Sequence, residues 1–376
     1  MKTILIVTTV QATISAFLVP HIRRLQEQGF DVHVATCISD LPKFSELLGG
    51  VTIFHIPFSR GLLSFSNLVA VKKIRKLFNT YHYDAVHVHT PIASFITRMV
   101  AYRTCKVYYT AHGFHFNEQG KGLSNLIYFL SEKVAGYRTD KLIVINSDDY
   151  QAAHKLVHKN KVLYIKGIGV DMRRFDLKEY SHSRRDQVKK ELGIARDTVV
   201  ITHLAEFTAN KRHIDVIEAC ERLKQKYTDF VILLAGQGHH QEMVKKEIAL
   251  RHLESHVKCL GYRSDIDDIL SITDIGLLVS LREGLPRSVM EMMSMAIPVV
   301  LTDIRGNRDL VVHGENGFLV PVMQPEKIAD SCLALIQDPA LRHEMGALSR
   351  KKIEQEYELD KILGEHDAIY KELLHG

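Results

Sequence analysis

Short runs of apolar, often β-branched residues alternate along the chain with stretches of helical periodicity. In the first half, the apolar runs predict buried strands at Ile4–Val10, Val32–Ala35, Val51–Ile56, Ala85–Val88, Lys106–Thr110, Lys141–Ile145 and Val162–Ile165. The amphipathic stretches between them predict helices, among them Phe17–Gln28, Asn67–Phe78 and Leu123–Ala135. Continuous apolar strands that alternate with helices are typical of a parallel sheet built from βαβ units.

The same pattern starts again in the second half. It predicts strands at Val199–Leu204, Phe230–Ala235, Val257–Leu260, Ile275–Val279, Pro298–Leu301 and Gly317–Val320, and helices at Ile214–Tyr227, Gln241–Leu250, Asp265–Ser271, Ser288–Ala296 and Pro325–Gln337. Gly167, Gly169 and the charged segment Asp176–Lys190 mark the boundary between the halves. We therefore predict an α/β fold with two doubly wound, Rossmann-like domains, residues 1–167 and 168–359. The amphipathic residues 360–376 are expected to pack back on the first domain.

The composition narrows the class of protein. The chain has 376 residues, 46% of them hydrophobic and 25% charged, and a net charge of +5, which is too mild a basic bias to indicate nucleic-acid binding. Five cysteines without a CxxC pair favour a reducing cytoplasm. The N-terminal apolar run breaks at Thr8-Thr9, which favours a first buried strand over a signal peptide. No apolar stretch is long enough to span a bilayer, so we expect a cytoplasmic protein, with at most peripheral membrane contact.

The segment Ser280–Glu291 carries the most informative chemistry. Glu283 follows a predicted buried strand, a Gly-Leu-Pro turn comes next, and Ser288 is a candidate N-cap for the following helix. The backbone N–H groups at such a helix start bind phosphate, and the carboxylates of Glu283 and Glu291 accept hydrogen bonds from sugar hydroxyls. The alternative is a capped surface helix with two solvated acids. The position at the carboxyl end of a strand, where open α/β sheets bind ligands, favours the binding site.

This segment resembles the E-x7-E signature of glycosyltransferase family 4, whose members are retaining enzymes of the GT-B fold. The flanking segments 298–303 and 316–321 match as well, and the resemblance covers nearly the whole chain. It implies two domains that face a central cleft, with acceptor binding in the first and nucleotide-sugar binding in the second. It places Glu283 beside the donor sugar and Glu291 on the ribose hydroxyls. The intervening donor-binding residues would be Gly284, Leu285, Pro286 and Ser288.

The resemblance also assigns roles to three further loops of the second domain. In the segment 205–211, Lys211 matches a lysine whose ammonium would neutralise the diphosphate, but Glu206 stands where the family has arginine. We expect Glu206 either to contact a donor hydroxyl or to point away, and Arg212 to supply part of the missing charge. Gly236 and Gly238 form a G-x-G turn that approaches the nucleotide in the family. Tyr262 lies in the loop that reads the base.

In the first domain, the loop 112–116 follows a predicted strand end. The resemblance makes His112 the residue that contacts the donor sugar, ahead of His115. His89 at a strand end, with Thr9 and Thr13 of the first loop, are the acceptor-side candidates. We interpret His87 and His89 as facing opposite sides of their strand, which disfavours a metal site there. The first loop lacks glycine, and the absence of G-x-G-x-x-G argues against a dinucleotide-binding dehydrogenase.

Two other motifs have structural interpretations that compete with functional ones. Asp265-Ile266-Asp267 reads as the D-x-D metal motif of other transferases, but Ser264 resembles an N-cap that would place the acids in a first helical turn. We therefore predict no essential metal and no cofactor. The basic amphipathic stretch Ala70–Leu77 is interpreted as a solvated helix face, with contact to an anionic membrane surface as the alternative.

The resemblance therefore implies a retaining glycosyltransferase that moves a hexosyl unit, and we expect the donor to be a UDP-sugar. The segment 305–309 resembles exopolysaccharide, capsule and lipid-linked oligosaccharide transferases, with the EpsD type nearest, which implies a glycan or polyprenyl-diphosphate-linked acceptor. Arg305 and Arg308 are candidates for binding an anionic ligand. Two alternatives stay open: a sugar-nucleotide epimerase of the same fold, and a catalytically silent subunit that only binds nucleotide.

Overall fold

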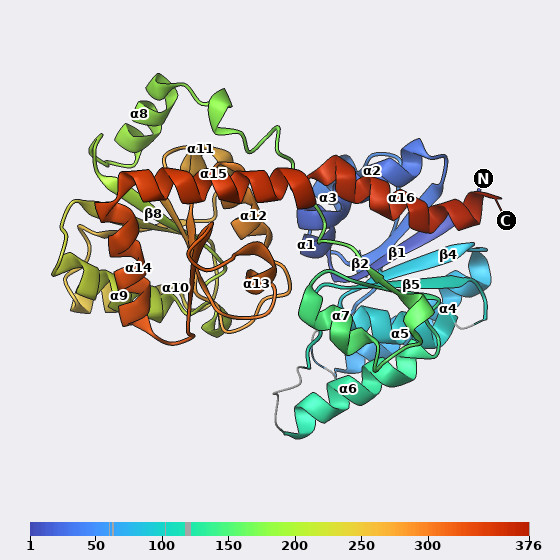
Figure 1. Cartoon of the computed structure of the whole chain (residues 1–376). Coiled ribbons are helices and arrows are strands. Elements are labelled where there is room, and N and C mark those ends of the chain that lie inside the picture. The colour runs from blue at the N-terminus through green and yellow to red at the C-terminus, as the bar shows by residue number, and fades with distance from the viewer. Residues whose placement is uncertain (60, 62–63, 102, 117–121, 376) are drawn as a thin grey trace. The chain divides into compact units, whose positions relative to one another are not determined.

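The computed structural model describes the chain except residues 60, 62–63, 102, 117–121 and 376 (Figure 1). The chain divides into two compact units. The first consists of Met1–Ile168 together with Asp360–Gly376, and the second of Gly169–Leu359. Each unit has its own sheet and its own hydrophobic core, and each is described separately.

The first unit is built on a seven-stranded sheet of order β3-β2-β1-β4-β5-β6-β7, and every paired register in it is parallel. The strands are β1 Thr3–Val10, β2 Asp31–Cys37, β3 Thr52–His55, β4 Ala85–His89, β5 Lys106–Ala111, β6 Lys141–Val144 and β7 Val162–Tyr164. The central strands are buried along most of their length, because helices cover both faces of a parallel sheet.

Two groups of helices form the two faces of this sheet. On one face, the core contains side chains of α4 Phe65–Thr80, α5 Pro91–Ala101 and α7 Ser147–Ala153, with Tyr128 and Phe129 of α6 Leu123–Gly136 packed against it. On the other, α2 Val19–Glu27, α3 Leu41–Leu48 and α16 Leu359–His375 contribute. Figure 1 shows α16, the last helix, beside α2. The helix expected over Phe17–Gln28 begins instead as a short turn α1 Gln11–Thr13 and a π-helical turn Ile14–Leu18.

The second unit has a six-stranded sheet of order β10-β9-β8-β11-β12-β13, with every paired register parallel. Its strands are β8 Val199–Leu204, β9 Phe230–Ala235, β10 Val257–Gly261, β11 Ile275–Leu278, β12 Val299–Thr302 and β13 Gly317–Val320. Its helices are α8 His182–Glu191, α9 His213–Lys224, α10 Gln241–Leu250, α11 Ile266–Ser271, α12 Arg287–Ser294, α13 Asn307–Leu310, α14 Pro325–Gln337 and α15 Pro339–Glu356. The two parallel sheets with their covering helices confirm the predicted α/β class with two doubly wound domains. In the described part of the chain, no helix is long and apolar enough to cross a membrane.

Candidate functional site

The carboxyl ends of β8 and β9 meet in a closely packed pair of loops. A Cβ atom on Gly236 would lie 2.0 Å from the carbonyl oxygen of Ala205, and one on Gly238 would lie 2.4 Å from that of Phe207. Both are closer than real Cβ contacts allow, so only glycine fits. The G-x-G turn is therefore required to bring the β9 loop against the β8 loop. This packing fixes the backbone that leads to Lys211.

A second pair of glycines positions the loop before α12. Gly306 has a φ of 78°, and a Cβ on it would lie 2.0 Å from the carbonyl oxygen of Gly284. Arg305 Nε donates to the carbonyl oxygen of Glu283 at 3.2 Å. The loop after β12 thus holds the Glu283-Gly284 backbone in place. Sequence reasoning assigned Arg305 to an anionic ligand and missed this packing role of Gly306, because the contact joins residues more than twenty positions apart.

The start of α12 differs from the expectation in one respect. The N-cap is Pro286, and no side chain caps the helix, so the prediction that Ser288 is the N-cap is wrong. Proline is favoured at a helix start because its ring fixes φ and the missing N–H has no intrahelical partner there. Ser288 lies in the first turn instead.

Lys211 and Glu283 come together at this edge of the sheet. Lys211 ends the short 3₁₀ helix Ala209–Lys211, and its Nζ lies 2.5 Å from Glu283 Oε1. Their side chains are only 22% and 11% exposed. The backbones on either side are joined by two further bonds, from Leu281 N–H to the Asn210 carbonyl oxygen and from Asn210 Nδ2 to the Arg282 carbonyl oxygen. The loops after β8 and β11 are therefore joined to each other, and they bring an ammonium group and a carboxylate together.

Glu291 lies one helical turn further, on α12. Its Oε1 accepts a hydrogen bond from Arg287 Nε at 2.8 Å. Burial raises the pKa of the Glu291 carboxyl, while the positive charges of Arg287 and Arg174 act against that rise. A buried carboxylate held by an arginine is oriented and keeps acceptor capacity on its oxygens. Sequence reasoning did not anticipate Arg287 or Arg174; the i, i+4 spacing of Arg287 and Glu291 is the signal for the first of them.

The remaining predicted donor-side residues have more open surroundings. Glu206 and Tyr262 are exposed, Tyr262 by 70%. Arg212 binds both carboxylate oxygens of Asp215, at 2.9 and 2.5 Å, so its charge is already engaged. Arg308 pairs with Asp303 at 2.6 Å. The structure thus provides local acid partners for two of the arginines that were expected to contribute positive charge to a ligand.

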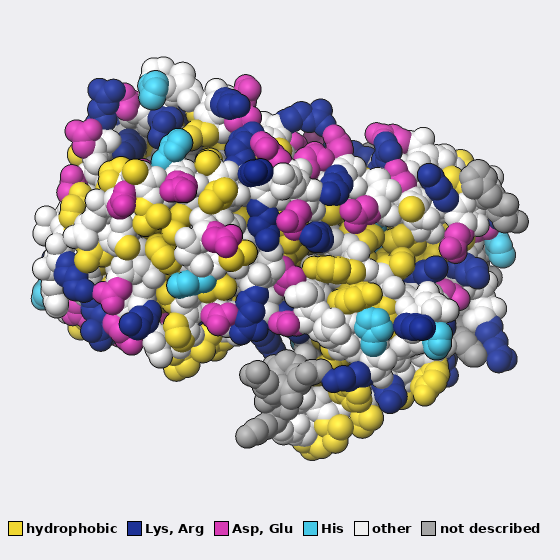
Figure 2. Space-filling model, viewed as in Figure 1, with side chains coloured by type: hydrophobic (Ala, Val, Ile, Leu, Met, Phe, Trp, Pro, Cys, Tyr) yellow, Lys and Arg dark blue, Asp and Glu magenta, His cyan; other side chains and the backbone are white. Residues whose placement is uncertain are grey.

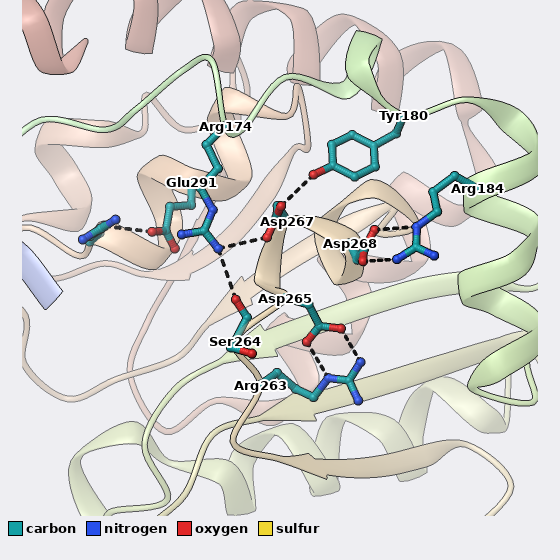
Figure 3. A network of polar contacts seen from close by, with 10 residues as sticks. Arg174, Tyr180, Arg184, Arg263, Ser264, Asp265, Asp267, Asp268 and Glu291 are labelled. Carbon is teal, nitrogen blue, oxygen red and sulfur yellow. Dashed lines mark hydrogen bonds and ion pairs between the residues drawn. The ribbon is translucent and has the colours of Figure 1, made fainter. Parts of the chain in front are cut away.

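The D-x-D motif is engaged in a network of ion pairs (Figure 3). Asp265 pairs with Arg263 at 2.5 Å, and it is the N-cap of α11 in place of the expected Ser264. Asp267 accepts from Arg174 Nη2 at 2.9 Å and from the Tyr180 hydroxyl at 2.8 Å. Figure 3 shows Arg174 between Glu291 and this motif. In the described residues, no group of three or more His, Cys, Asp or Glu side chains is placed to hold a metal ion.

In the first unit, His112 belongs to a cluster of histidines. Its Nε2 lies 3.0 Å from Nδ1 of His89, and the two rings stack. Burial lowers the pKa of His112 to about 4. The interpretation that His87 and His89 face opposite sides is wrong: their ring centroids lie 4.3 Å apart, because alternate residues of a strand share a face. His87 contacts Thr110 at 2.7 Å and the Tyr370 hydroxyl of α16.

The acceptor-side candidates surround the same strand ends. The backbone N–H and the hydroxyl of Thr9 both contact Thr90 Oγ1, at 2.9 and 2.8 Å. Thr13 lies in α1 and is half-buried. A small cavity of about 20 Å³, the room of one water molecule, is lined by His21, His87, His89, His112, His366 and Tyr370 among others. His115 is exposed, its ring lies tilted against that of Tyr128 with the centroids 5.4 Å apart, and it is not among the residues that line this cavity.

These buried histidines predict a loss of stability in mild acid. Burial lowers the pKa of His87 to about 3, whereas its pKa in the unfolded chain is 6.5. Below pH 6.5 the unfolded chain gains protons that the folded chain does not, so the free energy of unfolding falls, by about 2 kcal/mol at pH 5 for one such group. We expect chemical unfolding of the His87→Gln variant to show a shallower decrease between pH 7.5 and 5 than the wild type. His343→Gln, an exposed control, should leave the decrease unchanged, and a wild-type stability that stays constant over this range would contradict the account.

The chain matches two protein-family models. "Glycosyl transferases group 1" matches residues 184–352, and "Glycosyl transferase 4-like" matches residues 4–146. The chain is 32% identical over 93% of its length to EpsD of Bacillus subtilis, described as a glycosyltransferase, and the match covers 91% of that protein. It is 25% identical over 93% of its length to the UDP-Gal:alpha-D-GlcNAc-diphosphoundecaprenol alpha-1,3-galactosyltransferase of Escherichia coli, covering 91% of that enzyme.

A solved structure agrees with the fold. HepE of Anabaena, in complex with UDP and glucose, superposes with a TM-score of 0.83 at 18% sequence identity, and the match covers 99% of this chain and 100% of HepE. The family models cover both units, and the match to EpsD extends over almost the whole length of both proteins. The chain therefore belongs to glycosyltransferase family 4 of the GT-B fold, and it is a glycosyltransferase.

Proposed function

We propose that this enzyme transfers a hexosyl unit, with retention of anomeric configuration, from a UDP-sugar to a polyprenyl-diphosphate-linked sugar or glycan in exopolysaccharide synthesis. The observation that carries the proposal is the Lys211–Glu283 pair beside the uncapped start of α12. The names of two relatives support the donor and the acceptor: HepE is described in complex with UDP and glucose, and the Escherichia coli enzyme is named for a UDP-sugar and a diphosphoundecaprenol acceptor.

The leaving diphosphate would be stabilised by this edge of the second unit. Negative charge grows on the diphosphate as its bond to the sugar breaks, and preorganised donors lower the barrier. An ammonium has three N–H donors, so Lys211 can hold Glu283 and a diphosphate oxygen at the same time. The backbone N–H groups of Gly284–Ser288 would add the charge preference of a helix start. No metal and no cofactor has a part in this proposal.

The carboxylates would orient the donor. Glu283 would accept a hydrogen bond from a hydroxyl of the donor sugar, and Glu291 would accept from the ribose hydroxyls. Arg287 keeps the Glu291 carboxylate in one orientation. Gly236 and Gly238 let the neighbouring loop approach the nucleotide, and Tyr262 offers an exposed ring for the base. Glu206 is proposed to contact a donor hydroxyl, since an acid beside the diphosphate would repel it.

His112 is proposed to contact the donor sugar as a neutral donor or acceptor, in agreement with its lowered pKa. No protein nucleophile is assigned. The acceptor hydroxyl would pass its proton to the departing phosphate oxygen as the new glycosidic bond forms and the bond from sugar to diphosphate breaks. The reaction would occur in the cytoplasm, where nucleotide-sugars are supplied.

The test is a thermal-shift screen of the full chain against UDP-, GDP- and ADP-sugars, followed by turnover on lipid-linked acceptors. We expect the largest stabilisation with a UDP-sugar, since a ligand that binds only the folded chain raises its melting temperature. The anomeric configuration of the product, read by NMR, should match that of the donor. Absence of a shift with every nucleotide-sugar would count against the proposal.

Two other functions have specific readouts. A sugar-nucleotide epimerase of this fold would convert the UDP-sugar without an acceptor, so product analysis with donor alone separates it from a transferase. A silent nucleotide-binding subunit would show a thermal shift but no turnover. Glu206, in place of the arginine expected from the family resemblance, is the residue that favours this second alternative.

A further inference from the structure

One helix of the first unit exposes an apolar face instead of burying it. Helix α6, Leu123–Gly136, has five large apolar side chains that are 42–73% exposed, and Tyr137 directly after the helix is 75% exposed. These residues are Leu123, Leu126, Ile127, Leu130, Val134 and Tyr137. Their spacing of three, four and seven places them on one side of the helix. A contiguous exposed apolar face of this kind marks an interaction site.

The opposite side of α6 is fixed firmly to the unit. Glu132 accepts from Arg98 Nη2 at 2.7 Å and from the Tyr109 hydroxyl at 3.1 Å, and all three side chains are buried. A Cβ on Gly136 would lie 2.8 Å from the carbonyl oxygen of Leu156, so the end of the helix packs directly on the chain. The apolar face is therefore held outward by the fold.

The exposed charged residues of α4, α5 and α6 are all basic. Helix α5 packs against both α4 and α6, and these three helices contain a single acidic residue, Glu132, which is buried in its ion pair. Their exposed basic residues are Lys72, Lys73, Arg75, Lys76 and Lys133. On α4, Ala70, Ile74 and Leu77 are buried in the core. The basic residues of the stretch Ala70–Leu77 therefore face outward.

The two helices also align their exposed apolar residues. Helices α4, α5 and α6 each connect consecutive parallel strands, so they run in the same direction and begin at the same edge of the sheet. Phe65, Leu68 and Val69 in the first turns of α4 are 85%, 62% and 46% exposed. Figure 2 shows hydrophobic side chains gathered along the lower edge of the molecule, over α6 in Figure 1.

We propose that this face of the first unit, formed by α6 and the exposed side of α4, docks on an anionic lipid bilayer. Interfacial helices bind membranes by burying a leucine-rich side at the level of the headgroups while lysines and arginines attract anionic lipids. The basic stretch Ala70–Leu77 alone was the predicted contact. The structure places most of the apolar contact on α6, while α4 adds its basic residues and the three apolar side chains of its first turns. The inference rests on the exposed face alone and stands apart from the donor and acceptor assignments.

The test is co-sedimentation of the full chain with vesicles of equal parts phosphatidylglycerol and phosphatidylcholine, and with vesicles of phosphatidylcholine alone. We expect binding to the anionic vesicles that weakens with added salt, and much weaker binding to the neutral ones. Leu126→Gln/Leu130→Gln should lower the affinity about tenfold or more, and Lys72→Gln/Lys76→Gln should lower it and flatten the salt dependence. Leu250→Gln and Lys246→Gln on α10 are matched exposed controls that should change nothing.

Three outcomes would overturn the proposal. The first is a wild-type chain that fails to bind anionic vesicles, and the second is an α6 double variant that binds them as the wild type does. The third is a wild-type dimer in light scattering that the α6 double variant converts to a monomer without any vesicle binding in either, which would make the face a contact between two copies. UDP binding by the α6 variant should equal that of the wild type, and this readout distinguishes loss of docking from loss of the fold.

Discussion

Replacement of Lys211 by alanine is expected to reduce turnover at saturating donor by about 100- to 1,000-fold, the effect of removing one preorganised donor from a developing negative charge. The change removes the ammonium that would face the diphosphate. It also leaves the Glu283 carboxylate, only 11% exposed, without the partner at 2.5 Å and with its charge next to the leaving group. Both effects raise the barrier, so kcat should fall more than KM rises.

The control for this variant is Lys226→Ala. Lys226 also pairs with a carboxylate, that of Asp330 at 2.8 Å, but both side chains are 53% exposed. An exposed pair of this kind contributes about 0–1 kcal/mol, so activity should remain near that of the wild type. Lys211→Arg, which keeps the charge, should retain more activity than Lys211→Ala. Near-normal rates for Lys211→Ala would contradict the assigned role.

Glu283→Gln should produce a different pattern. The amide keeps the size of the side chain but removes the charge that pairs with Lys211, so the ammonium is left for the diphosphate. We expect turnover to fall by about 10- to 100-fold, since the hydrogen bond to the donor sugar weakens in the transition state. UDP affinity should stay the same or increase. Calorimetric titration of UDP and steady-state kinetics measure the two effects separately.

The matched control is Glu242→Gln, which removes an exposed carboxylate paired with Lys245 at 2.8 Å on α10. Neither UDP affinity nor turnover should change. A Glu283→Gln variant that loses UDP affinity together with activity would show that the carboxylate serves the fold of the loop and not the sugar.

The strands of both sheets could be predicted from the sequence, because buried parallel strands appear in it as continuous apolar runs. Strand order and register were not predicted, because alternation with helices indicates a parallel sheet without fixing which strands are neighbours. Helix α15 was not anticipated, and the charged segment that contains α8 was interpreted only as a boundary. Both helices are rich in charged residues and have weak apolar periodicity, so propensity and tertiary packing decide them.

Only part of the candidate site could be predicted from the sequence. Lys211, Glu283 and Glu291 were identified through their position after strands, and the structure joins the first two directly. Two features could not be predicted, because they join segments that lie far apart in the sequence and leave no local pattern. They are the close packing of Gly306 on Gly284 and the charge interaction of Arg174 with Glu291. The exposed face of α6 was equally hidden, because periodicity predicts a helix without saying which side packs inward.

The account depends most on the claim that the start of α12 and Lys211 hold a nucleoside diphosphate without a cation. Calorimetric titration of UDP into the full chain, in buffer that contains EDTA, measures this directly. We expect binding with one site per chain, weakened about tenfold or more in Lys211→Ala and unchanged in Lys226→Ala. Binding that appears only when Mg²⁺ is added, or that is the same in Lys211→Ala and the wild type, would contradict the claim.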